Sequence, residues 1–394
     1  MFKNKNSKIT NIITVFISIL FTVILIELIL RFNYKNEIKN KQAGVSHIEY
    51  ILSNPPALSN KNIYSKKAIK TALYFAPVEY DSVAKTWRLL DFKSDGFNII
   101  NGNRFTEYNN KDAKNFIHMF GGSTLYCQIV PDKHTVSSYL QLFVNKISKK
   151  YNVINYGVPS HMTQDQVIRL KESSLKSGDI VIFYGGNNDI AYIVGRDNRS
   201  GQGKEGGSDA NAAVHNIQHY SPIQKIIIKI YYTFPKRYIL KTLYRKITLP
   251  NTTGIGVHKD SIKSSVDYLS KYYSSQVITA QKITSVKKSY FYNFLQPNLY
   301  IKNITSLSNE EKRIKKNDKL IKTSSETPYL ISFPVLKKIV REELNEYSYD
   351  LTSIFDNVKD EIFTGDYIHV NHIGNKVIAR SIFDVIQDRI NKAH

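Results

Sequence analysis

The sequence contains almost no cysteine, and this scarcity excludes two classes of structure. Of the 394 residues only Cys127 is a cysteine. The chain therefore cannot form an internal disulfide or a metal site built from several thiolates. Cys127 follows Ser123 by four residues and is the obvious rival to it as a nucleophile, but we expect a small, semi-buried side chain there. We expect neither a cofactor nor a metal.

Acidic residues are also scarce. The 33 Asp and Glu residues are outnumbered by 55 Lys and Arg residues, which gives a formal net charge of +22. Such a charge favours non-specific attraction to anionic membrane surfaces or acidic polysaccharide. The basic residues are spread along the whole chain, and no RNA-stacking sheet signature or paired Cys/His finger accompanies them. We therefore expect no nucleic-acid partner, and the oligomeric state is left open.

Long apolar runs are absent except near the start. Residues 12–30 (IITVFISILFTVILIELIL) carry one charge, Glu27, and have the length of roughly 20 residues that a bilayer-spanning helix needs. A cleaved signal peptide is the alternative, but the run exceeds a typical signal core and no small-x-small site follows it. The sequence predicts a membrane anchor in residues 1–32, with the rest of the chain outside the cytoplasm.

Two regions follow this run. Residues 33–114 are expected to form a tether and a small β-rich lead segment, because short β-prone runs are interrupted there by Asp95-Gly96 and Asn101-Gly102, dipeptides typical of hairpin turns. From residue 115 to the end, predicted strands alternate with predicted helices, which is typical of an α/β fold with a parallel sheet. The strands are 116–120, 151–155, 179–184 and 289–295, and the helices are 135–149, 163–176, 260–283, 329–347 and 372–390.

An insertion interrupts this alternation at about 195–288. Residues 221–247 are apolar, aromatic and basic, with a break at Pro235. They are consistent with a pair of helices closing over a cleft, or with an amphipathic element lying on a membrane. We favour the lid because the insertion directly follows a candidate site loop.

Four short stretches carry candidate chemistry. Ser123, Gly157 and Asn188 each follow a predicted strand, and the carboxyl ends of parallel strands form the ligand crevice of an open sheet. A serine hydroxyl is a weak nucleophile unless a base takes its proton. Asp366 and His369 are three residues apart, so that one loop can present the base with a carboxylate behind it. An Asn amide and backbone N–H groups can stabilise an oxyanion, and glycine permits close approach of the backbone.

These stretches, in this order, resemble the motif blocks of the SGNH hydrolase superfamily, also called GDSL esterases. The resemblance covers residues 115–190 and 288–390. It implies a three-layer sandwich whose five-stranded parallel sheet has flavodoxin-like order. It also implies the following roles: Ser123 as nucleophile, His369 as base, Asp366 as the orienting acid, and Gly157 and Asn188 as oxyanion donors together with the Ser123 N–H.

One position departs from the family motif. Gly122 replaces the Asp of Gly-Asp-Ser, and the resulting Gly-Gly-Ser-Thr form resembles a membrane-anchored bacterial branch. Because that Asp is not a member of the triad, its loss removes no chemistry. It does prevent a transfer of substrate from the better-studied branch.

Other titratable residues near these motifs have simpler interpretations. His372 is an alternative base, but the spacing to Asp366 and the Gly374-Asn375 that follows favour His369. We expect Asp189 to hold the Asn188 loop through hydrogen bonds. His118, His134 and His161 are expected to be surface or loop residues. None of them has an Asp or Glu at a spacing in the sequence that would indicate a catalytic pair.

The resemblance implies a membrane-anchored extracytoplasmic serine esterase. Its partner would be an ester-bearing substrate, and an acylated glycan at the cell surface suits the location and the basic charge. Two alternatives stay open: an O-acyltransferase that uses the same triad on a surface polysaccharide, and a non-catalytic, membrane-tethered scaffold or glycan-binding protein.

Overall fold

The computed structural model describes residues 58–60, 62–64, 78–81, 83–94, 96–195, 259–320 and 326–392, together with Thr14, Ser18 and Thr22. The chain divides into two compact units. The first comprises residues 1–44 and 212–254, of which only Thr14, Ser18 and Thr22 are described, all in helical conformation. The second comprises residues 45–211 and 255–394 and contains all the strands described below.

A parallel sheet forms the centre of the second unit. Its five parallel strands lie in the order β6-β5-β7-β8-β9. Numbered among themselves along the chain, they have the order 2-1-3-4-5, which is that of flavodoxin-like folds. The predicted α/β architecture and the strand order implied by the family resemblance are thus confirmed. The strands are β5 (Asn115–Gly121), β6 (Tyr151–Asn155), β7 (Ile180–Gly185), β8 (Tyr290–Leu295) and β9 (Ser348–Asp350).

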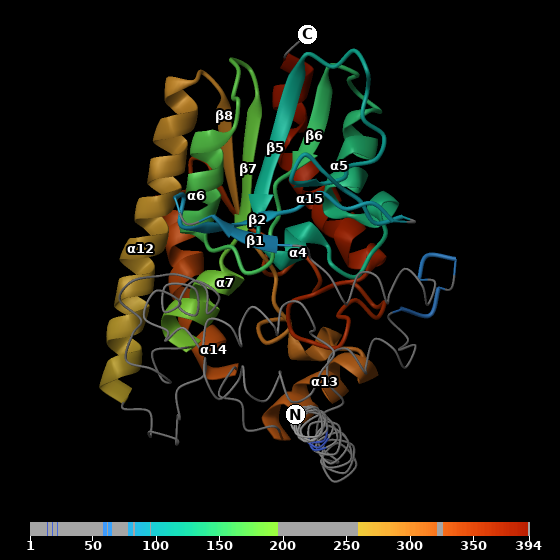
Figure 1. The fold of residues 1–394 in the computed structure, drawn as a ribbon. Coiled ribbons are helices and arrows are strands. Elements are labelled where there is room, and N and C mark those ends of the chain that lie inside the picture. Colours follow the sequence, from blue (N-terminus) through green and yellow to red (C-terminus); the bar gives the residue numbers. More distant parts are fainter. Residues whose placement is uncertain are drawn as a thin grey trace, which may run out of the picture. The chain divides into compact units, whose positions relative to one another are not determined.

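Helices cover both faces of this sheet (Figure 1). Because successive side chains of a strand point to opposite faces, Ile180 and Ile182 of β7 enter one core, and Val181 and Phe183 enter the other. The first core lies under α5 (Val136–Val144) and α15 (His372–Lys392). The second lies under α6 (Thr163–Glu172), α12 (Lys259–Val286) and α14 (Glu326–Lys338).

The lead segment contributes two hairpins. Strands β1 (Val78–Asp81) and β2 (Thr86–Leu89) form a separate two-stranded sheet. Strands β3 (Ile99–Ile100) and β4 (Asn103–Arg104) extend the main sheet antiparallel to β6, giving it seven strands. At their turn Asn101 and Gly102 both have positive φ, 53° and 66°, as a type I′ hairpin requires. The hairpin predicted at Asn-Gly is therefore confirmed.

Shorter elements complete the described parts of the chain. The helix predicted over residues 329–347 begins earlier, as α14, and continues into a π-helical turn, η6 (Ile339–Glu343). The remaining elements are α4 (Ser123–Tyr126), η2 (Asp132–His134), α7 (Asn187–Asp189), η3 (Ile190–Val194), η5 (Ile304–Ser306) and α13 (Asn309–Leu320).

The predicted membrane anchor requires a correction. Among the described residues, no helix has both the length and the apolar character that crossing a bilayer demands. The longest, α12, has 28 residues, but it mixes polar and apolar side chains and buries one face in the domain core. The run at 12–30 lies outside the described residues except for Thr14, Ser18 and Thr22. On this finding, the predicted N-terminal transmembrane helix and the predicted membrane-anchored, extracytoplasmic location are wrong.

The predicted insertion at 195–288 is described only in part. Residues 196–258 lie outside the described residues, so the lid and the membrane-surface element stay predictions. From Lys259 onward the chain forms α12, which connects β7 to β8. Its buried Leu269, Tyr273 and Val277 belong to the second core. This part of the insertion is therefore a crossover helix of the α/β domain.

Candidate active site

Ser123 lies where β5 meets the sheet's carboxyl edge. The strand ends at Gly121, and Ser123 is the first residue of the short helix α4 (Figure 1). A Cβ at position 121 would lie 2.7 Å from the Tyr184 carbonyl oxygen, and one at position 122 would overlap Asn188 Nδ2. The two glycines thus allow neighbouring strand and loop to approach the start of α4 closely. Ser123 itself is 8% exposed.

His369 links Ser123 to a carboxylate. Its Nε2 lies 2.8 Å from Ser123 Oγ, and its Nδ1 lies 2.6 Å from Asp366 Oδ2. The other carboxylate oxygen, Asp366 Oδ1, accepts hydrogen bonds from the backbone N–H groups of Ile368 and His369, at 2.9 and 2.7 Å. The Asp366 carboxylate therefore fixes the conformation of its own loop and, at the same time, the position of the imidazole. The three-residue spacing in sequence produces this geometry.

The charge of His369 is set by two opposing effects. Burial disfavours the imidazolium, but the Asp366 carboxylate stabilises it through its charge and its hydrogen bond, and the pKa of His369 is raised above 6.5. When the imidazole is neutral and donates Nδ1–H to Asp366, Nε2 is left as an acceptor for the serine hydroxyl. The arrangement can therefore withdraw a proton from Ser123.

Asn188 is held beside Ser123 from two sides. Its Nδ2 donates one hydrogen bond to the His161 carbonyl oxygen at 2.9 Å, which leaves the second amide hydrogen for another acceptor. The next residue, Asp189, is buried and accepts hydrogen bonds from Thr163 N and Thr163 Oγ1, at 2.9 and 3.0 Å. Burial raises the pKa of Asp189 to about 6. These bonds fasten the Asn188 loop to the start of α6, as expected for Asp189.

Gly157 has a different environment from the one expected. Its N–H donates to Asn155 Oδ1 at 2.8 Å, so this predicted oxyanion donor already has a partner. A Cβ at position 157 would lie 2.5 Å from Tyr126 N and 2.9 Å from the Leu125 carbonyl carbon. Glycine is needed here because the loop packs directly against α4. Ser160, in the same loop, has a left-handed φ of 70°, a conformation that clusters at functional sites.

A second set of buried amides, not expected from the sequence, supports the site. Gln296 Nε2 donates to Thr124 Oγ1 at 2.8 Å, next to Ser123. Asn298 Nδ2 donates to Asn187 Oδ1 at 2.9 Å, and Asn187 Nδ2 donates to the Pro297 carbonyl oxygen at 3.2 Å. One signal could have found Gln296 and Asn298: like Ser123 and Asn188, they come shortly after a parallel strand, here β8.

The rivals to Ser123 and His369 are engaged elsewhere. Burial raises the pKa of Cys127 to about 12, and its thiol donates to the Thr124 carbonyl oxygen at 3.2 Å. His372 Nδ1 lies 3.0 Å from the Tyr64 hydroxyl, and burial lowers the pKa of His372. Neither is placed for nucleophilic or base chemistry with the other members of the site.

Two other histidines do not lie at the surface positions that were expected from the sequence. His118 and His161 are both buried. His118 Nε2 lies 3.2 Å from Asp179 Oδ2, so it does have a carboxylate partner, supplied by the neighbouring segment of the sheet across 61 residues. Single-sequence spacing could not reveal a partner from the segment that leads into the adjacent strand, β7. Within the described ranges, no three His, Cys, Asp or Glu side chains gather as a metal site.

Comparisons with known proteins give structural similarities only. No family model matches the chain, and no curated protein sequence matches it. One similar solved structure is a member of the lipolytic G-D-S-L family from Veillonella parvula, 13% identical, covering 69% of this chain and 98% of its own, with a TM-score of 0.36. The acetyl xylan esterase AlAXEase is 14% identical over 69% of this chain and 99% of its own, with a TM-score of 0.39. Axe2, an acetylxylan esterase from Geobacillus stearothermophilus, is 14% identical over 71% and 94%, with a TM-score of 0.34.

Proposed function

We propose that this chain is a serine ester hydrolase of the SGNH, or GDSL, superfamily. The observation that carries the proposal is the hydrogen-bonded line from Ser123 Oγ through His369 to Asp366, with its two contacts of 2.8 and 2.6 Å. It lies at the carboxyl edge of a doubly wound parallel sheet, where ligands bind in such folds. Nucleophile, base and orienting carboxylate are the three roles that acyl transfer through serine requires.

The reaction follows from these contacts. Ser123 Oγ attacks the carbonyl carbon of the ester while His369 Nε2 takes the hydroxyl proton. Asp366 stabilises the imidazolium that forms. As the tetrahedral intermediate collapses, His369 returns the proton to the leaving alkoxide, and an acyl-serine remains. A water molecule then repeats the sequence, giving up its proton to His369 and releasing the carboxylic acid and the free serine.

The oxyanion of the intermediate needs donors beside Ser123. We assign this role to the free amide hydrogen of Asn188 and to the Ser123 backbone N–H. The Asn188 amide is fixed by the His161 carbonyl and lies against Gly122. Each donor of this kind contributes about 3–4 kcal/mol to transition-state stabilisation. Gly157 contributes by letting its loop pack beneath α4.

We propose esters on an acidic glycan as the natural substrate class. The support is the chain's net charge of +22, which concentrates polyanions near the protein surface. Ser123 is buried apart from 8% of its surface, and the His369 side chain is 17% exposed. A substituent that projects from a polymer, such as a short acyl group, can reach a hydroxyl at that depth.

Hydrolysis of p-nitrophenyl acetate by the full chain tests the proposal. We expect Ser123→Ala and His369→Ala each to lower kcat by about 10⁴- to 10⁶-fold, because triad members act as a unit. His372→Ala is the matched control and should keep activity within a few-fold of wild type. Loss of activity in the control but not in His369→Ala would overturn the assignment of the base. An inactive wild-type protein would overturn the proposed function.

A further inference from the structure

Arg104 is a buried charged residue that is not a member of the proposed catalytic triad. It is the last residue of β4, in the lead segment, and its side chain has no exposed surface. A guanidinium in such a position is costly unless its donors are satisfied and its charge is paired. The surroundings of Arg104 meet both conditions.

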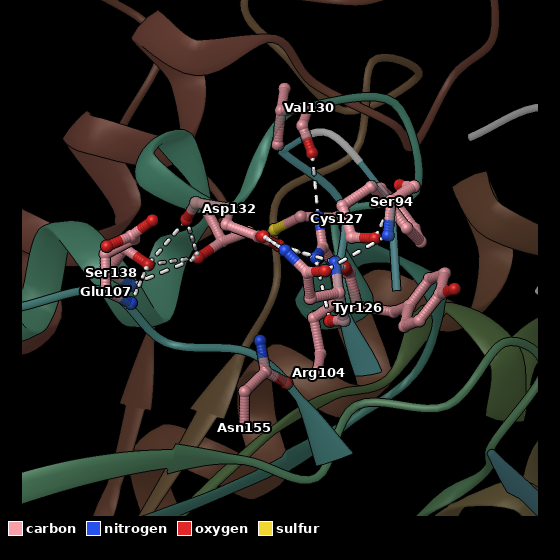
Figure 2. Close-up of polar contacts among 12 residues, drawn as sticks. Ser94, Arg104, Glu107, Tyr126, Cys127, Val130, Asp132, Ser138 and Asn155 are labelled. Carbon is pink, nitrogen blue, oxygen red and sulfur yellow. Dashed lines mark hydrogen bonds and ion pairs between the residues drawn. The ribbon is translucent and has the colours of Figure 1, made fainter. Parts of the chain in front are cut away.

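The guanidinium joins three segments of the chain (Figure 2). Its Nη1 is paired with the buried Asp132 carboxylate and also donates to the Asn98 carbonyl oxygen at 3.2 Å. Its Nη2 donates to the Val130 carbonyl oxygen at 2.9 Å, and its Nε donates to the Tyr126 carbonyl oxygen at 3.2 Å. Tyr126 is the last residue of α4, the helix that Ser123 begins.

The hydrogen bonds within α4 do not satisfy the carbonyl groups at its carboxyl end. It has four residues, so its last carbonyl groups have no partners within the helix, and the chain leaves it through Cys127 in left-handed conformation, φ 56°. Side chains supply the missing donors. Asn155 Nδ2 donates to the Leu125 carbonyl oxygen at 2.9 Å, and Arg104 Nε donates to that of Tyr126. Arg104 and Asn155 are also paired through their backbones at the β4–β6 edge.

We propose that Arg104 is a positioning residue for the nucleophile: the lead-segment hairpin, through this side chain, fixes α4 and thereby the direction of Ser123 Oγ toward His369. The inference rests on the proposed function. It makes the hairpin part of the catalytic unit, although residues 98–104 lie outside 115–190 and 288–390, the ranges over which the sequence motifs resemble the SGNH family.

The test measures the rate at which a fluorophosphonate labels Ser123 in the full chain. The variant Arg104→Met/Asp132→Asn removes both buried charges together, so neither is left unpaired. We expect it to fold, as judged by circular dichroism, and to be labelled at least about 10-fold more slowly, since small misplacements of reacting groups carry large kinetic penalties. The pH midpoint of labelling should not move, because His369 and Asp366 are untouched. Arg104→Lys keeps the positive charge but has a single donor group, so its labelling rate should lie between those of wild type and the double variant.

Asp179→Asn is the control for a general loss of stability. Asp179 is buried just before β7, at the amino ends of the parallel strands and away from Ser123, where it accepts hydrogen bonds from Phe116 N and Lys176 N, at 2.8 Å each. This variant should be destabilised yet labelled at the wild-type rate. Labelling of the folded double variant at the wild-type rate would overturn the proposal. So would a labelling rate that falls in both variants in proportion to their loss of stability. Failure of the wild-type protein to label at Ser123 would instead overturn the proposed function.

Discussion

At the scale of single residues, the behaviour of His369 depends on the charge of Asp366. The carboxylate contacts the imidazole directly and two backbone N–H groups of its own loop. It therefore fixes the position of His369 as well as its pKa. The family resemblance named this pair from the sequence. The loop geometry that satisfies both carboxylate oxygens became visible only in three dimensions.

Asp366→Asn should change the pH profile of ester hydrolysis. His369 accepts a proton only when it is neutral, so kcat/KM should rise with pH through the His369 pKa. Asp366 raises that pKa against the effect of burial. Without its charge the acid limb should move to lower pH, while the maximum falls by about 10⁴-fold because the imidazole loses its oriented tautomer. An acid limb at the wild-type position would contradict this view of the pair.

Gly122→Ala tests whether Asn188 is a donor. The new Cβ would overlap Asn188 Nδ2 and displace the amide. Removing one oxyanion donor lowers kcat by about 10²- to 10³-fold, and KM should change little. Gly195→Ala is a matched control, because a Cβ there meets nothing closer than 3.8 Å. Full activity of Gly122→Ala in a kinetic assay would exclude Asn188 from the reaction.

At the scale of elements, the site is assembled from the ends of strands β5, β7 and β8 and from the loop that precedes α15. Apolar periodicity predicted these strands because each is buried and bounded by glycine, proline or polar residues. It could not predict their side-chain bonds, such as that of Gln296 to Thr124, since these join residues 172 positions apart. Nor could it predict that β4 pairs with β6, because a two-residue strand leaves no periodic pattern.

Gln296→Met should weaken the attachment of α4 to β8. The substitution keeps the approximate volume but removes the donor to Thr124 Oγ1. A lost buried hydrogen bond costs about 1–3 kcal/mol. We expect kcat to fall by about 10-fold, because α4 gains freedom, with KM unchanged. Gln281→Met, on the exposed side of α12, should leave both constants unchanged. A rise in KM alone would place Gln296 in substrate binding instead.

At the scale of the whole molecule, the strand order 2-1-3-4-5 brings Ser123 and His369 together across 246 residues. The alternation of strands and helices predicted the α/β class, and the motifs predicted the order through the family resemblance. The membrane anchor was one failed prediction, and the surface positions of His118 and His161 were another. The anchor prediction came from a single apolar run, a signal that uses composition and length but no tertiary contact.

The buried carboxylate of Asp189 should make global stability depend on pH. Its pKa in the folded state, about 6, is above the ordinary value of 3.8. Between these values the folded chain holds a proton that the unfolded chain has lost, so stability falls as pH rises. The difference corresponds to about 3 kcal/mol. Urea unfolding of wild type and Asp189→Asn should show wild type losing stability relative to the variant from pH 4 to 6. Parallel curves would contradict the shift.

The proposed activity requires that Ser123 is a nucleophile activated by His369. The most direct measurement is to treat the full chain with a fluorophosphonate and to locate the adduct by peptide mass spectrometry. We expect a single adduct on Ser123, which is absent in Ser123→Ala and strongly reduced in His369→Ala. An adduct on Cys127, or no adduct on the folded wild-type protein, would contradict it.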